Sequence, residues 1–123
     1  MILNLSWGCQ MSRNYVELTG HLWITPDLQR TVAGKPYLQF RLATKRGYGK
    51  YSKTDMLTVV LWEQQALEAA EVLRPGLDVS VKGMLITRGY KAADDGRVIQ
   101  ECMVSCNWWK IGEMEESDDA TQP

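Results

Sequence analysis

The chain has 123 residues, 45% of them hydrophobic and 24% charged, which allows a single domain with one hydrophobic core. No apolar run reaches the roughly 18 residues of a membrane-spanning helix, and the start lacks the basic residues of a secretory signal, so we expect a cytoplasmic protein without a membrane partner. The formal net charge of −1 combines 14 basic and 10 acidic residues in positions 1–112 with five acidic and no basic residues in 113–123.

Residues 15–24 alternate between apolar and polar side chains, which is typical of a half-buried strand. Gly20 falls on the inner face, where a barrel needs a sharp bend. The other inner residues are Val16, Leu18, Leu22 and Ile24. After a loop over 25–36, a second strand alternates in the same way, with Leu38, Phe40 and Leu42 inward.

Residues 45–54 hold Gly47 and Gly49 among basic residues and tyrosines, and this composition predicts an exposed hairpin tip. A third strand follows over 56–62. Its inward residues are predicted to be Leu57, Val59 and Leu61, and its outward residues Met56, Thr58, Val60 and Trp62.

The pattern changes to a helical period over 63–73, with Ala66, Ala69, Ala70 and Leu73 on one side, and Pro75 and Gly76 end the helix. Alternation returns in a fourth strand, which places Val79, Val81, Gly83 and Leu85 inward. A polar hairpin loop over 89–96 leads to a fifth strand over 98–109, with Cys102, Val104 and Cys106 on one face. The order predicts a mainly β fold: a five-stranded Greek-key OB-fold barrel with one helix between strands three and four.

Two flanking segments complete the domain organisation. We predict an N-terminal extension of unassigned role (1–11), an OB-fold domain (12–110) and a short acidic tail (111–123) that is disordered. An acidic tail behind a basic body occurs in nucleic-acid-binding proteins, and a tail that only aids solubility is the alternative.

The three cysteines are an odd number and argue against a disulfide framework. Cys102 and Cys106 are four residues apart, while Cys9 and the single histidine, His21, are remote in sequence. This spacing does not suit a zinc site, so we predict buried, reduced cysteines and neither a metal nor a cofactor.

Binding a single strand without reading its sequence requires basic side chains for the phosphates and flat side chains on which bases stack. The two long hairpins and the strand between them combine both, although a solvated tip and locally packed tyrosines would produce a similar pattern. The candidate DNA-binding residues are Arg41, Lys45, Arg46, Tyr48, Lys50, Tyr51, Lys53, Met56, Trp62, Arg88, Tyr90 and Lys91, with Arg97 near the second tip. Trp108 and Trp109 are adjacent, so at least one should pack against the barrel. Trp7 and Trp23 remain unassigned.

Several stretches resemble the bacterial single-stranded DNA-binding protein family over residues 12–107. They are Leu-Thr-Gly-His-Leu at 18–22, Phe-Arg-Leu-Ala-Thr at 40–44, Thr-Val-Val-Leu-Trp at 58–62 and the run from Val81 to Tyr90. The resemblance implies that DNA wraps over one face and that Tyr48, Trp62 and Tyr90 stand at stacking positions, while Met56 stands where many members carry tryptophan. It also implies a homotetramer, with a dimer as the alternative, in which first strands pair near Glu17, Thr19 and His21.

Two features depart from the resemblance. The family's long linker and hydrophobic Pro-Phe tip are missing from the end, and the family's start aligns near Met11. We predict a protein that binds and protects single-stranded DNA without sequence specificity during replication, recombination or repair, near the nucleoid, with replication or recombination proteins as further partners. The alternative is a primosomal or mobile-element accessory protein on the same fold that acts through protein contacts. The scattered acids and single histidine provide no constellation for an enzyme, so no catalytic residue is predicted.

Overall fold

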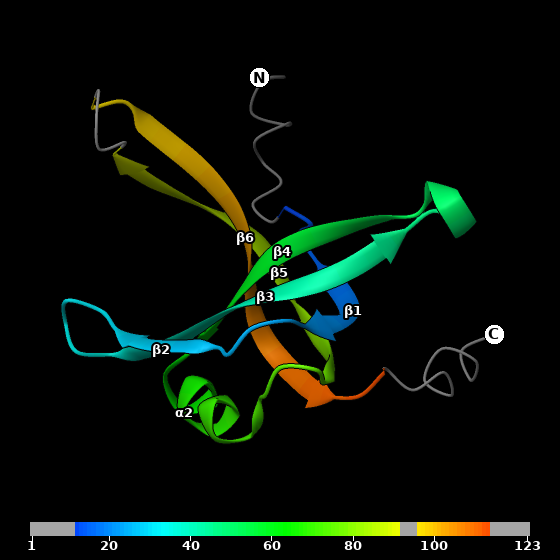
Figure 1. The fold of residues 1–123 in the computed structure, drawn as a ribbon. Coiled ribbons are helices and arrows are strands. Elements are labelled where there is room, and N and C mark those ends of the chain that lie inside the picture. The colour runs from blue at the N-terminus through cyan, green and yellow to red at the C-terminus, as the bar shows by residue number, and fades with distance from the viewer. Residues whose placement is uncertain (1–11, 92–95, 114–123) are drawn as a thin grey trace.

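The computed structural model describes residues 12–91 and 96–113 (Figure 1). Tyr90 and Lys91 are described by their backbone alone. The described elements, in chain order, are β1 (Val16–Leu22), β2 (Asp27–Arg30), β3 (Pro36–Arg46), the 3-10 turn η1 (Gly49–Tyr51), β4 (Lys53–Trp62), α2 (Glu63–Val72), β5 (Asp78–Lys91) and β6 (Val98–Ile111). In this part of the chain, no helix is long and apolar enough to cross a membrane.

Five of the strands form a closed barrel. They pair in the order β1, β5, β6, β4 and β3, and a short contact between β1 and β3 closes the ring. All pairs are antiparallel except β4 with β6, which are parallel at Val59 and Val60. The predicted OB-fold barrel is confirmed, and its helix α2 lies between the third and fourth barrel strands, which are β4 and β5 here.

The loop predicted over 25–36 contains a sixth strand, which the sequence analysis missed. The four residues of β2 are all exposed, so they show no alternation of apolar and polar side chains that a pattern could detect. Their partner is β3, opposite Pro36 to Gln39. β2 forms because the edge of β3 at these residues has unpaired backbone groups. Its existence therefore depends on a contact with another strand and not on its own sequence pattern.

The core lies inside the barrel and against α2. Its buried apolar side chains include Leu22, Leu38, Phe40, Leu42, Val59, Leu61, Ala66, Ala69, Leu73, Val79, Val81, Val104 and Cys106. The alternating strand patterns therefore predicted most of the core, and the helical spacing of Ala66, Ala69 and Leu73 predicted the face of α2 that packs on it.

Beyond the barrel, residues 86–91 of β5 and 98–103 of β6 continue as a projecting two-stranded arm (Figure 1). The pairing of β1 with β5 ends at Gly83, and Leu85, two residues farther along β5, is exposed, contrary to the prediction. Ile24 is exposed because β1 ends at Leu22. At the arm, β5 extends to Lys91, so the predicted loop over 89–96 begins too early. At the other end, β6 includes Ile111, one residue beyond the predicted domain.

A bulge in β6 reorients the end of that strand. Lys82 pairs with Trp108 and Gly83 with Cys106, so Asn107 is an extra residue without an opposite partner in β5. The shift places Trp109 against the core, which confirms the prediction that at least one of the adjacent tryptophans packs on the barrel. Trp108 stays exposed.

The cysteines are only partly as predicted. Cys106 is buried, and burial raises the pKa of its thiol above the ordinary value. Cys102 is exposed because it lies on the arm side of β6, where the barrel no longer covers it. Cys9 lies outside the described residues.

Candidate nucleic-acid interface

The side chains of β3 and β4 that point away from the core lie on one side of this strand pair, here called the outer face. Because Leu38, Phe40 and Leu42 point inward, their neighbours point outward. The backbone register joins the outer-face residues in five cross-strand rows: Lys45 with Thr54, Ala43 with Met56, Arg41 with Thr58, Gln39 with Val60, and Tyr37 with Trp62.

Small and buried side chains form the floor of this face. Val60 and Thr58 point outward as predicted, but Val60 is only 1% exposed and Thr58 is buried as well. Val60 borders the same cavity as Met103 and Ile86, which belong to the start of the arm. The arm therefore covers the middle of β4, and the sequence pattern of β4 alone does not predict this.

Trp62 lies at one end of the outer face and is 41% exposed. Its indole Nε1 donates a hydrogen bond to Ser105 Oγ at 3.0 Å. Its ring lies 5.9 Å from that of Tyr37, with the two planes tilted by 39°. These contacts orient the indole and leave part of it open to a ligand. Arg88 of the arm lines the same cavity of about 320 Å³, so a cation lies near the aromatic surface.

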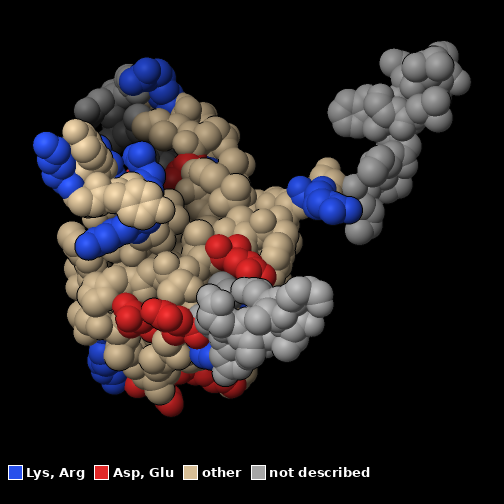
Figure 2. All heavy atoms as spheres, turned by 90° about the vertical axis from the view of Figure 1, so that its right-hand side faces the viewer, with Lys and Arg blue, Asp and Glu red and all other residues tan. Residues whose placement is uncertain are grey.

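The tip of the β3–β4 hairpin carries the most exposed aromatic side chains. Tyr48 is 90% exposed and Tyr51 is 74% exposed. Lys50 Nζ lies 5.4 Å from the centre of the Tyr51 ring, a cation–π contact. Figure 2 shows basic side chains gathered at the upper left of the face that includes this tip. Both ingredients of single-strand binding, cations and flat rings, are therefore present at the tip.

One basic residue of this group is already paired with an acid. Arg46 Nε lies 2.7 Å from Asp55 Oδ2, and this hydrogen bond, together with the charge of Asp55, raises the pKa of Arg46 further. The sequence analysis did not consider Asp55, which lies opposite Thr44 in the β3–β4 register. Arg46 is consequently less available to a phosphate than the lysines around it.

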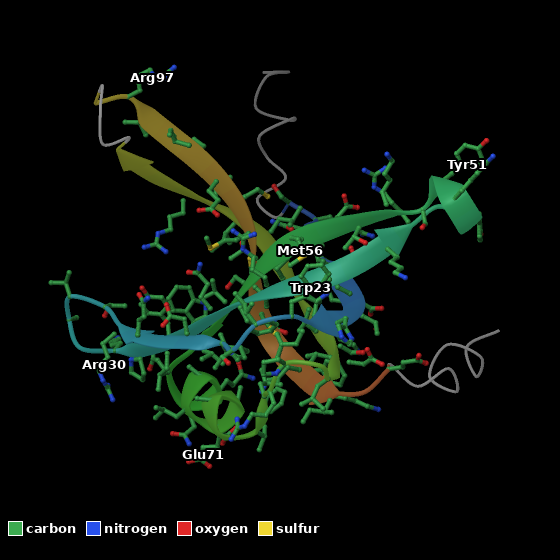
Figure 3. The ribbon with its side chains drawn as sticks, viewed as in Figure 1. Trp23, Arg30, Tyr51, Met56, Glu71 and Arg97 are labelled. Atoms are coloured by element: carbon green, nitrogen blue, oxygen red, sulfur yellow. The ribbon has the colours of Figure 1, made fainter. Side chains whose placement is uncertain are left out.

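The other predicted residues lie along β3 and β4 or on the arm. Arg41, Lys45 and Lys53 are exposed along β3 and β4, and Met56 is half-buried beside Ala43. Tyr90 and Lys91 are in β5 of the arm, but their side chains lie outside the described residues. Figure 3 shows Tyr51 at the tip of the β3–β4 hairpin and Arg97 at the tip of the β5–β6 arm, and the two tips project in different directions. The two hairpins therefore approach each other at the outer face and not at their tips.

Sequence reasoning missed two aromatic residues at this surface. Tyr37 packs against Trp62 and follows the outward alternation of Gln39 and Arg41, so the strand period could have identified it. Trp23 follows the last residue of β1, and its place beside β3 depends on closure of the barrel. Within residues 12–91 and 96–113, no group of three or more His, Cys, Asp or Glu side chains could hold a metal ion.

A closed five-stranded barrel with a helix after its third strand is an oligonucleotide-binding fold. Its outer face and hairpin tip combine exposed rings with basic side chains, as proteins that bind single-stranded nucleic acid do. These features define the class of the protein.

The model of the single-strand binding protein family matches residues 13–112, and the chain belongs to this family. Among its relatives, the single-stranded DNA-binding protein of Bacillus cereus and single-stranded DNA-binding protein 2 of Listeria innocua are each 35% identical over 88 residues. Single-stranded DNA-binding protein A of Bacillus subtilis is 34% identical over 88 residues. These alignments cover 69% of this chain and 52%, 55% and 51% of the three relatives, so the chain spans about half of their length.

A solved structure of an SSB from Plasmodium falciparum in complex with single-stranded DNA has the same fold. It matches with a TM-score of 0.71 and 24% sequence identity, over 84% of this chain and 97% of that chain. At this level of identity the match supports the architecture of the barrel alone.

Proposed function

We propose that the protein binds single-stranded DNA without sequence specificity and protects it during replication, recombination or repair. The observation that carries this proposal is Trp62, which two neighbours orient and which stays partly open beside Arg88. Stacking on an indole is open to every base, because every base has a flat π surface, and phosphates are neutralised by lysine and arginine whatever the sequence. The family and the names of the relatives support the same function.

The proposed interface works by binding alone, without turnover of the nucleic acid. Its stacking residues are Tyr48, Tyr51, Trp62 and Tyr90, with Met56 as a weaker apolar contact, and its phosphate-binding residues are Arg41, Lys45, Arg46, Lys50, Lys53, Arg88 and Lys91. We further propose that it acts in the cytoplasm, near the nucleoid, and that replication or recombination proteins bind alongside it on the exposed strand.

Replacing Trp62 by alanine is expected to weaken binding of oligo-dT by about 1–3 kcal/mol, the usual contribution of one stacked base. The fold should persist, because Trp62 points out of the core and its hydrogen bond to Ser105 lies near the surface. The measurement is fluorescence anisotropy of labelled oligo-dT, with circular dichroism as the test of folding.

Trp108→Ala is the matched control, since Trp108 is exposed to a similar degree on the β5–β6 wall, against Lys82. This variant should bind oligo-dT as the parent chain does. If both tryptophan variants bind with parent affinity, the outer face is not the binding surface. If the parent chain prefers duplex DNA, the proposed function is wrong.

We propose a homotetramer in which the first strands pair between subunits, with a dimer as the alternative. In the described part of the chain, β1 pairs with β5 from Val16 to His21 but with β3 only at His21 and Leu22. One edge of β1 therefore keeps backbone groups that another strand can pair with. Sedimentation equilibrium should give about four times the 14.0 kDa of one chain. A mass of two chains would favour paired barrels, and a mass of one chain would contradict assembly.

A further inference from the structure

A cavity lies at the other end of the outer face from Trp62. Its volume is about 460 Å³, and its lining includes Trp23, Ala43, Lys45, Asp78 and Glu113. None of these residues except Lys45 belongs to the proposed interface. The cavity therefore adds the ring of Trp23 and the carboxylates of Asp78 and Glu113 to the proposed interface, whose other members are basic residues and other aromatic rings.

Trp23 reaches this cavity because β1 crosses from β5 to β3. His21 is opposite Ala43 in β3, and Ala43 is opposite Met56 in β4, so the three side chains form one row on the outside of the barrel. Leu22 points into the core, and Trp23 follows it on the same side as His21. Figure 3 shows Trp23 and Met56 over β3 and β4.

A glycine makes this crossing possible. A Cβ atom on Gly20 would lie 2.5 Å from the carbonyl oxygen of Ala43, far inside van der Waals contact. The close approach of β1 to β3 therefore depends on Gly20. Beyond it Trp23 remains 57% exposed, so most of its ring is available to a ligand.

The chemistry of the cavity suits a nucleobase whose phosphate lies outside. Lys45 contributes a cation to the lining and belongs to the β3–β4 hairpin. Asp78 and Glu113 would repel a phosphate, but carboxylates accept hydrogen bonds from the ring N–H or amino groups of bases. Every base carries at least one such donor on its pairing edge. His21 Nδ1 lies 3.1 Å from Asp78 Oδ1, which orients that carboxylate.

We propose that Trp23 stacks a second base of the bound single strand and that this cavity receives the base. The inference rests on the proposed function and extends the path of the strand across the outer face. Met56 and Trp62 are six positions apart in β4, about 20 Å at the usual rise. Trp23 lines its cavity together with Ala43, the partner of Met56, so the indoles of Trp23 and Trp62 are too far apart to hold the same base, and each holds its own.

The test compares Trp23→Ala and Trp23→Phe with the parent chain on labelled oligo-dT of roughly 16 nucleotides, enough to cover one barrel. Trp23→Ala should weaken binding about 5- to 150-fold, and Trp23→Phe should retain most of the affinity because it keeps a flat ring. Combined with Trp62→Ala, the losses should multiply, since the sites are distant and independent. Trp108→Ala again serves as the control.

The outcomes separate this inference from the proposed function. If the parent chain binds oligo-dT and Trp62→Ala weakens it while Trp23→Ala does not, the second base site is wrong and the function stands. If the parent chain does not bind, the function itself fails. If Trp23→Ala leaves affinity unchanged but alters the sedimentation mass, the cavity receives a second copy of the chain and the inference is overturned.

Discussion

Between 50 and 200 mM salt, the affinity of the chain for oligo-dT is expected to fall about 300-fold. Each phosphate neutralised on a single strand contributes about −0.7 to the slope of log affinity against log salt. Arg46 is already paired with Asp55, so six other cations of the proposed interface remain to neutralise phosphates. Six contacts correspond to a slope of about −4. These cations are Arg41, Lys45, Lys50, Lys53, Arg88 and Lys91.

Single substitutions refine this measurement. Lys45→Gln should make the slope shallower by about 0.7, whereas Asp55→Asn should make it steeper by a similar amount because it releases Arg46. Lys82→Gln is the control, since Lys82 lies over Trp108 on the β5–β6 wall and should leave the slope unchanged. A slope near zero for the parent chain would contradict an interface built on these cations.

Gly83→Ala is expected to lower the free energy of unfolding by about 3 kcal/mol or more. A Cβ atom at Gly83 would lie 2.0 Å from the carbonyl oxygen of Ser105 and 2.9 Å from the Cα of Cys106. Both are backbone atoms of β6 at the bulge, so no side chain can move to relieve the clash. The loss is large against the 5–15 kcal/mol of a typical domain.

Urea unfolding followed by circular dichroism measures this effect, with Gly89→Ala as the matched control in the same strand. At Gly89 the nearest atom to a new Cβ is the Nε2 of Gln100, 3.2 Å away at the end of a flexible side chain. That variant should unfold within about 0.5 kcal/mol of the parent chain. An unchanged urea midpoint for Gly83→Ala would mean that β5 and β6 are farther apart at the bulge.

The tryptophans illustrate how much of the binding site the sequence predicts. The alternation over 56–62 places Trp62 outward, and the structure finds it partly exposed. Its hydrogen bond to Ser105 and its contact with Tyr37 join residues from β4, β6 and β3, which no local pattern brings together. The residues around Trp23 in the sequence do not predict where it lies, because its position depends on the pairing of His21 with Ala43.

The sequence by itself determined the five barrel strands, the helix and most of the core, because burial on one face of a strand or helix leaves a period in the chain. Leu38, Phe40 and Leu42 show this period for β3, and Ala66 and Ala69 show it for α2. Only the tertiary structure decided the existence of β2, the bulge at Asn107 and the burial of Val60. Each of these depends on backbone groups or side chains of a distant strand, and such contacts leave no periodic pattern in the local sequence.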